Sequence, residues 1–245
     1  MMSTGSLNSL ALIVPTLNEA ENIDKVLGEV SAALSETRYE YEIVVVDDGS
    51  TDGTAENVRQ WTKRDPRIRL VARAGERGLA GAVLEGWSQS GANLLGVIDA
   101  DLQHPPELLP RLLQAAEQAD IAIASRYARD NGTQGWNPLR AAVSRLSTLA
   151  AAPLISKKNL RVTDPMSGFF VVRRRCIEGL VFQTTGFKLL LEILVRGRIQ
   201  TVHEVPYQFG IRRAGRSKAN ASVAIHYLHL LGRLSRDMVL RSSEP

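Results

Sequence analysis

Apolar runs and helical periodicities alternate through the first half of the chain. Five short runs rich in aliphatic and β-branched residues predict strands at residues 10–14, 42–46, 68–72, 94–98 and 121–124. Between them, apolar residues recur at helical spacing. These segments predict a helix capped by Asn22, then helices at 55–63, 78–90 and 107–118, the last with Pro106 in its first turn. The alternation predicts an α/β fold with a mostly parallel central sheet flanked by helices.

The pattern is looser after Arg126. Residues 130–137 are rich in turn formers, and residues 140–154 alternate arginine with small and apolar residues. Further along, we expect a strand at 169–172, a buried helix at 187–195 and an edge strand at 201–209, where Pro206 cannot donate to a ladder. A polar, basic loop at 211–222 then leads into a final helical pattern through Leu240.

Composition is that of an ordinary globular protein. The chain has 245 residues, of which 44% are hydrophobic and 23% charged. Cys176 is the single cysteine, so no intrachain disulfide forms and a reducing compartment is expected. The N-terminus lacks the pattern of a secretion signal. The most apolar stretch, 141–155, is interrupted by Arg145 and preceded by Arg140, so we expect no membrane span.

Acidic residues follow two of the predicted strands. Asp47 and Asp48 come after the second strand, and Asp99 and Asp101 come after the fourth. Open α/β sheets bind ligands outside the carboxyl ends of their strands. The two acidic strand ends are therefore expected to face one site that holds a divalent cation and a nucleotide.

The segment Asp99-Ala100-Asp101 has the spacing of a metal site. In extended backbone, residues two apart point the same way, so both carboxylates could reach one ion, and Gln103 adds an amide oxygen at the next step. These hard oxygen ligands suit Mg²⁺ or Mn²⁺. His104 is either a further ligand or, as we favour, a histidine that caps the loop or faces solvent.

The segment 47–54, Asp-Asp-Gly-Ser-Thr-Asp-Gly-Thr, combines turn formers with carboxylates. Gly49 allows a tight turn, and Asp52 or Thr54 can cap the helix that begins near residue 55. A capped turn explains half of these residues. It does not explain two adjacent acids at a strand end, and one carboxylate there could accept hydrogen bonds from a base or a ribose.

The glycines at 78 and 81 fit neither a dinucleotide fingerprint nor a phosphate-binding loop, which disfavours kinases, ATPases and dehydrogenases. Close packing of a helix through small residues explains them better.

Basic residues lie at scattered positions in the second half of the chain. Arg126 follows the fifth strand, while Arg140 and Ser144 are one helical turn apart. Guanidinium groups and a hydroxyl suit phosphate oxygens. Arg212 and Lys218 add two further cations. Each of these is either a phosphate ligand or a plain surface charge, depending on whether they converge with the acidic site.

The chain resembles glycosyltransferase family 2 of GT-A type, and within it the dolichol-phosphate (polyprenyl-phosphate) mannosyltransferases. The segments that carry the resemblance span residues 14–218: 14–22, 47–54, 99–106, 125–127, 164–170 and 205–218. The motifs at Asp47 and Asp99 are shared across family 2, whereas those at 164–170 and 212–218 are narrower. The implied fold is GT-A, or Rossmann-like, with a catalytic domain at 1–218 and a C-terminal basic amphipathic helix at 219–245.

The resemblance also implies roles for individual residues. The metal would be held by Asp99, Asp101 and Gln103, with Ala100 touching the nucleotide. The lipid phosphate would be bound by Arg126, Arg140 and Ser144, and the diphosphate by Arg212 and Lys218 from a closing loop. The nucleoside would be held by Pro15, Leu17, Glu19, Val46 and Asp48. Leu17 departs from the tyrosine expected in eukaryotic relatives, which removes a ring that would stack on the base.

The implied reaction is the inverting, metal-dependent transfer of mannose from GDP-mannose to a polyprenyl (dolichyl) phosphate. A phosphate monoester is already ionised near neutral pH, so no general base is required. Three alternatives remain: a family 2 enzyme that uses UDP-glucose or another sugar nucleotide, a nucleotidyltransferase, and a non-catalytic nucleotide-binding or membrane-scaffold protein. A nucleotidyltransferase would need a glycine-rich phosphate loop, which residues 15–20 do not provide.

The net charge of +4 is concentrated near the C-terminus, where residues 203–245 contain seven basic and three acidic residues. Such asymmetry indicates either an anionic partner or solvated helix faces. Apolar residues at roughly helical spacing accompany this charge: Tyr227, Leu228, Leu231, Leu234, Met238 and Val239. The resemblance favours peripheral attachment to the cytoplasmic face of a membrane, either directly or through a membrane protein partner, and no nucleic-acid partner.

Overall fold

The computed structural model describes residues 8–74, 78–128, 138–183, 188–210 and 221–242, and within them one seven-stranded sheet forms the centre of the molecule. The strand order is β3-β2-β1-β4-β6-β5-β7. Only β6 is antiparallel to its neighbours β4 and β5, so the sheet is mostly parallel, as predicted. The strands are β1 (Ser9–Thr16), β2 (Glu40–Asp47), β3 (Ile68–Ala72), β4 (Leu94–Val97), β5 (Ile121–Ser125), β6 (Phe170–Arg173) and β7 (Val202–Pro206).

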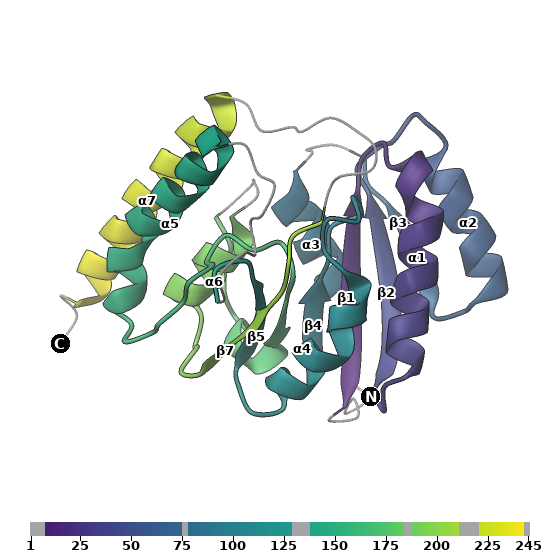
Figure 1. Ribbon diagram of the computed structural model, residues 1–245, viewed down its shortest axis with the longest axis horizontal. Helices are drawn as coiled ribbons and strands as arrows, with labels where there is room; N and C mark the ends of the chain where they lie inside the picture. Colours follow the sequence, from purple (N-terminus) through teal and green to yellow (C-terminus); the bar gives the residue numbers. More distant parts are fainter. Residues whose placement is uncertain (1–7, 75–77, 129–137, 184–187, 211–220, 243–245) are drawn as a thin grey trace.

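Helices cover both faces of the sheet (Figure 1). One face packs against α1, α2 and α4, and the other against α3, α5, α6 and α7. The bounds are α1 (Ala20–Ser35), α2 (Thr54–Arg64), α3 (Leu79–Ser88), α4 (Leu109–Ala116), α5 (Pro138–Ser156), α6 (Leu189–Arg196) and α7 (Ala221–Ser242), with 3₁₀ turns η1 (Pro106–Leu108) and η2 (Arg174–Cys176).

The period-two alternation of β1 explains the two layers. Leu10 and Leu12 enter the core beneath α1, whereas Ala11 and Ile13 enter the core beneath α3. A Cβ atom at Gly86 of α3 would lie 2.8 Å from Ile13 Cδ1, so this glycine lets the helix sit directly on the strand. Small residues in this helix therefore serve close packing, as the sequence indicated.

Two predicted helix starts are wrong. α1 begins at Ala20 rather than after an Asn22 cap, and Asn22 Nδ2 instead donates to Glu19 Oε2 at 2.9 Å inside the first turn. The helix predicted at 107–118 is divided into η1 and α4, with the chain entering the 3₁₀ turn at Pro106. Proline fixes φ but does not choose between 3₁₀ and α geometry.

Helices α5 and α7 lie side by side at one end of the molecule (Figure 1). Apolar side chains on them remain exposed: Val143, Leu146 and Leu149 on α5, and Leu228 on α7. Among the described residues, no helix is both long and apolar enough to cross a membrane.

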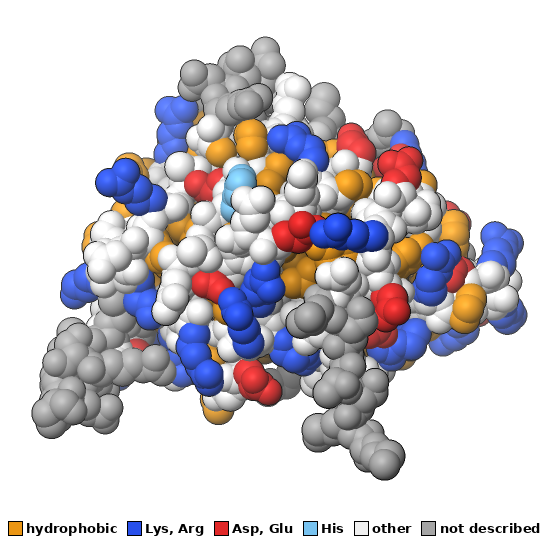
Figure 2. Space-filling view, turned by 90° about the horizontal axis from the view of Figure 1, so that it is seen from below, with side chains coloured by type: hydrophobic (Ala, Val, Ile, Leu, Met, Phe, Trp, Pro, Cys, Tyr) orange, Lys and Arg blue, Asp and Glu red, His pale blue; other side chains and the backbone are white. Residues whose placement is uncertain are grey.

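Figure 2 views the molecule from below, where basic and acidic side chains are interspersed. Near the amino ends of strands, an ion pair between Arg38 and Glu117 at 2.7 Å connects two loops, and one between Arg67 and Asp65 at 2.8 Å lies within a single loop. Exposed pairs of this kind contribute little to stability.

Candidate active site

The carboxyl ends of β1, β2 and β4 meet at one edge of the sheet, because the three strands are parallel and β1 lies between the other two. The loops after β1 and β2 are tied together. Asn18 Oδ1 accepts a hydrogen bond from Thr51 N at 2.9 Å, and Asn18 N donates to Ser50 Oγ at 2.8 Å. The loops that carry Leu17, Glu19 and Asp48 thus form one unit. The other predicted nucleoside contacts, Pro15 and Val46, lie at the ends of β1 and β2.

Asp52 fixes the start of two helices. Its carboxylate accepts from Ala20 N at 2.9 Å, where α1 begins, and from Thr54 N at 3.0 Å, where α2 begins. Burial opposes the ionised form, but these hydrogen bonds and that of the Thr54 hydroxyl outweigh it and lower the pKa of Asp52. The N-cap position of α2 is Gly53 rather than Asp52 or Thr54, yet Asp52 still binds one backbone N–H at the start of each helix.

The adjacent acids Asp47 and Asp48 have different surroundings. Asp47 accepts from Thr16 Oγ1 at 3.0 Å and from Ser50 N at 2.9 Å, so it closes the turn in which Gly49 has φ 80°. Asp48 Oδ1 contacts Arg73 Nη1 at 2.5 Å, and Asp48 Oδ2 accepts from Gly78 N at 2.8 Å. Asp47 is therefore a structural residue, whereas Asp48 lies on the α3 side of the strand end.

The segment Asp99–Asp101 is not extended, so the geometric reason for expecting both carboxylates to point the same way is wrong. β4 ends at Val97, and Ala100 and Asp101 form a turn that continues into Leu102 with φ 59°. Asp101 is buried and its Oδ1 accepts from Gln103 N at 3.1 Å. The carboxylate side chain of Asp99 is 31% exposed.

His104 is buried rather than solvent-facing, which corrects one of the expectations for it. Its Nε2 lies 3.3 Å from Asp99 Oδ2, and its Nδ1 lies 2.9 Å from Tyr207 Oη on the segment that follows β7. The ring packs edge-on against Phe169 and Phe209. His104 thus holds one oxygen of Asp99 in place from the protein side.

The donor chemistry of this loop fits a hard divalent cation. Two carboxylates, Asp99 and Asp101, come from one turn, and the amide of Gln103 is anchored beside them through Nε2, which donates to Gly210 O at 3.2 Å. Among the described residues, no cluster of three His, Cys, Asp or Glu side chains could hold a metal. A metal at this loop would therefore need oxygens beyond the two carboxylates, which Gln103 and substrate phosphates would supply.

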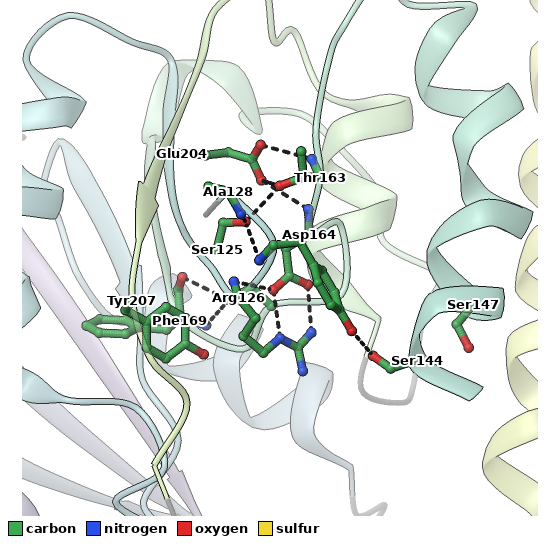
Figure 3. Close-up of polar contacts among 12 residues, drawn as sticks. Ser125, Arg126, Ala128, Ser144, Ser147, Thr163, Asp164, Phe169, Glu204 and Tyr207 are labelled. Carbon is green, nitrogen blue, oxygen red and sulfur yellow. Dashed lines mark hydrogen bonds and ion pairs between the residues drawn. The ribbon is translucent and has the colours of Figure 1, made fainter. Parts of the chain in front are cut away.

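Arg126, at the end of β5, is bound to Asp164 (Figure 3). Arg126 Nε donates to Asp164 Oδ2 at 2.7 Å, and Nη2 donates to Oδ1 at 2.6 Å. Burial opposes the charge, but the hydrogen bonds to Asp164 raise the pKa of Arg126 above its ordinary value. On the far side of the segment, Glu204 accepts from the backbone of Thr163 and Asp164 at 2.9 and 3.0 Å.

The segment that contains Asp164 also reaches the acidic loop. A Cβ atom at Gly168 would lie 2.6 Å from Asp99 Oδ2, so only glycine fits beside that carboxylate. One short stretch therefore contacts both Arg126 and Asp99. This explains in physical terms why residues 164–170 stood out in the sequence.

Ser144 on α5 is joined to the same region, because Tyr127 Oη donates to Ser144 Oγ at 2.7 Å and the ring of Tyr127 lies 5.6 Å from the Arg126 guanidinium (Figure 3). The structure thus links Arg126 to Ser144 through Tyr127. Arg140 lies one turn earlier on α5, but its side chain is outside the described residues, as are Arg212 and Lys218 entirely.

Several residues at this edge of the sheet were given no role from the sequence. Arg73 pairs with Asp48, Tyr127 links Arg126 to α5, and Lys188 lies near Arg126 at the start of α6. Each is an ordinary residue type in an ordinary context. The Ser-Arg-Tyr run at 125–127 is the one signal that could have drawn attention to Tyr127.

The strand order and the loops at the sheet edge define a GT-A glycosyltransferase. A family description, glycosyl transferase family 2, matches residues 11–181, and the chain belongs to this family. The family predicted from the motifs is therefore confirmed.

Curated relatives extend the match over nearly the whole chain. A dolichol-phosphate mannosyltransferase of Pyrococcus furiosus is 37% identical over 93% of this chain, which spans 64% of that protein's length. Proteins of the same name from Saccharomyces cerevisiae and Mycosarcoma maydis are each 34% identical, and the chain covers 86% and 81% of their lengths.

Solved structures agree on the fold. Glucosyl-3-phosphoglycerate synthase of Mycobacterium tuberculosis, in complex with Mn²⁺, UDP and glucosyl-3-phosphoglycerate, superposes with a TM-score of 0.68 at 20% identity, covering 93% of this chain and 80% of that one. A complex of the same enzyme with Mn²⁺, UDP-glucose and glycerol 3-phosphate gives a TM-score of 0.69 at 19% identity, over 93% and 80% of the two chains.

Proposed function

We propose that this enzyme transfers mannose, with inversion, from GDP-mannose to a polyprenyl (dolichyl) phosphate. The observation that carries the proposal is the 34–37% identity to three dolichol-phosphate mannosyltransferases over at least 91% of the chain. The arrangement of Arg126 and Ser144 near the acidic loop supports it, because an acceptor that is itself a phosphate needs cations and hydroxyl donors beside the donor site.

On the donor side, Pro15, Leu17, Glu19, Val46 and Asp48 hold the nucleoside, and Ala100 lies against the nucleotide. Support comes from the tied loops after β1 and β2. The carboxylate of Asp48 is oriented from two sides, by Arg73 and by the backbone N–H of Gly78 directly before α3. Arg212 and Lys218 bind the diphosphate in this proposal.

Asp99, Asp101 and Gln103 hold Mg²⁺ or Mn²⁺. The ion neutralises negative charge on the diphosphate leaving group when bound. The structural neighbours whose complexes contain Mn²⁺ with UDP or UDP-glucose support a divalent cation in this proposal.

On the acceptor side, Arg126, Arg140 and Ser144 bind the phosphate of the lipid. The acceptor oxygen is already anionic near neutral pH, so no residue has to remove a proton before it attacks. The task of the protein is to hold that oxygen close to the sugar carbon and to offset the charge of two phosphorylated substrates. Asp164 fixes the Arg126 guanidinium for this purpose.

The acceptor also places the enzyme at a membrane. We assign residues 1–218 to the catalytic domain and 219–245 to a basic amphipathic helix that docks on the cytoplasmic face, directly or through a membrane protein partner. The exposed apolar side chains Val143, Leu146, Leu149 and Leu228 on the paired helices α5 and α7 support an apolar contact surface at this end of the molecule.

The test is transfer of labelled mannose from GDP-mannose to a polyprenyl phosphate. UDP-glucose serves as the competing donor, because it is the nucleotide sugar in complexes of the structural neighbour. That likeness concerns the fold, at 19% identity, so GDP-mannose is the donor we propose.

A further inference from the structure

Lys188 is a partly buried cation directly before α6. Its Nζ lies 5.3 Å from the centre of the Tyr227 ring on α7, so the ammonium is held over an aromatic face. Burial and, next, repulsion by Arg126 lower the pKa of Lys188 to about 8, while Asp164 acts in the opposite direction. Lys188 thus lies within electrostatic reach of the Arg126–Asp164 pair.

A series of contacts through Tyr227, α5 and Tyr127 connects Lys188 to the proposed acceptor site. Tyr227 Oη donates to Ser147 O on α5, and Ser144 lies one turn earlier on the same helix. Ser144 in turn contacts Tyr127, whose ring lies beside Arg126. Arg126, Ser144 and Lys188 therefore approach one region from β5, α5 and α6 respectively.

The carboxylates described near Lys188 contact other groups. Asp164 is the carboxylate that acts on Lys188, but both of its oxygens are already bound to Arg126. Glu204 contacts the backbone of Thr163 and Asp164 on the side away from the Arg126 guanidinium (Figure 3). Glu192, one turn along α6, accepts from Arg196 Nη1 at 2.5 Å. Among the described residues, Lys188 forms no ion pair with a carboxylate.

Partial burial of a lysine without a carboxylate partner costs free energy unless an anion compensates the charge. We propose that Lys188 binds the phosphate of the acceptor together with Arg126 and Ser144, an inference that rests on the proposed function. The ammonium supplies a point charge on a flexible side chain and three hydrogen-bond donors. These complement the planar guanidinium of Arg126, whose orientation is fixed. The aromatic face of Tyr227, 5.3 Å from the ammonium, stabilises its charge.

The test compares Lys188→Gln with Lys188→Arg and with Lys157→Gln, a control at an exposed lysine just after α5. KM is measured separately for the polyprenyl phosphate and for GDP-mannose. We expect Lys188→Gln to raise the acceptor KM roughly tenfold to hundredfold, with the donor KM unchanged, and Lys188→Arg to keep most of the affinity. An unchanged acceptor KM, or an equal rise in both, overturns the proposal.

Two further measurements separate the possible failures. Calorimetric binding of citronellyl phosphate, a short polyprenyl phosphate, reports acceptor affinity without turnover, and Lys188→Gln is expected to weaken it by the same factor. Wild-type protein that binds this probe but transfers no mannose contradicts the proposed function and not the role of Lys188. Lys188→Met removes a partly buried charge and is expected to melt no lower than the wild type, so it replaces Lys188→Gln should that variant fold poorly.

Discussion

The guanidinium of Arg126 and the carboxylate of Asp164 form a two-pronged ion pair, with donor–acceptor distances of 2.7 and 2.6 Å, at a position where Asp164 is fully buried. Arg126 follows β5, and Asp164 opens the stretch that ends beside Asp99 at Gly168. The stretch 164–168 therefore links Arg126 to the acidic loop. In the function we propose, Asp164 orients the Arg126 guanidinium.

Asp164→Ala leaves a buried arginine without its partner. We expect a loss of about 3–5 kcal/mol in the free energy of unfolding, measured by urea denaturation, because an uncompensated buried charge is strongly destabilising. Glu56→Gln serves as the control: it breaks an exposed pair with Arg59 at 3.3 Å and is expected to cost less than about 1 kcal/mol. Equal losses in the two variants would contradict a special role for the buried pair.

Gly168→Ala places a methyl group against Asp99 Oδ2, where a Cβ atom would be 2.6 Å away. We expect the Mn²⁺ concentration that gives half-maximal turnover to rise about tenfold, because an oriented metal ligand is displaced. Gly91→Ala is the matched control, since nothing lies within 4 Å of its Cβ position. A metal requirement that stays the same in Gly168→Ala would show that Asp99 is not held by this contact.

Asp101→Ala removes a proposed metal ligand. We expect metal-dependent turnover to fall to background at any Mn²⁺ concentration, whereas Glu107→Ala, at an exposed residue in the next turn, keeps its activity. Turnover assays across a Mn²⁺ series provide the measurement. Activity like that of the wild type in Asp101→Ala would refute the site assignment.

Arg140→Ala tests the acceptor side without touching the donor loops. We expect the KM for polyprenyl phosphate to rise about tenfold or more, since a charge-assisted contact to phosphate is lost, while the KM for GDP-mannose is unchanged. Arg145→Ala, an exposed arginine on the same helix, is the control. An effect confined to GDP-mannose would count against the role of Arg140.

Asp120 governs part of the acid sensitivity of the fold. Burial opposes its ionised form, but hydrogen bonds from Gln200, Arg175 and Thr201 dominate and lower its pKa from 3.8 to about 2. The folded state therefore binds this proton more weakly than the unfolded chain. The stabilisation is present above pH 4 and is lost as the pH falls towards 2. Asp120→Asn should lower the free energy of unfolding by about 1–2 kcal/mol at pH 7. Urea titrations should show that the difference in free energy of unfolding between the variant and the wild type becomes smaller near pH 2. A constant difference would contradict this explanation.

The first half of the fold could be predicted because the spacing of apolar residues and the positions of turn-forming residues indicate the same strands and helices there. The strand at 68–72 coincides with β3, and the acidic residues after β2 and β4 lie at one edge as expected. The antiparallel direction of β6 could not be predicted, since a run such as 169–172 has the same composition in either direction. Its place between β4 and β5 depends on long-range pairing.

The candidate site was predictable as a set of chemical groups but not as a set of contacts. Arg126 and Asp164 are 38 residues apart, and no local spacing connects them. The contact of His104 with Tyr207, 103 residues away, likewise depends on the folded sheet. The turn at Ala100–Asp101 replaces the extended geometry expected from the Asp-x-Asp spacing, because β4 ends earlier, at Val97.

The most direct test of the account is transfer of labelled mannose from GDP-mannose into a polyprenyl phosphate, with and without Mn²⁺. We predict a labelled lipid product that requires the metal and whose formation an excess of UDP-glucose does not suppress. Binding of GDP without any metal-dependent transfer to lipid would contradict the account, and efficient transfer from UDP-glucose in place of GDP-mannose would contradict the donor.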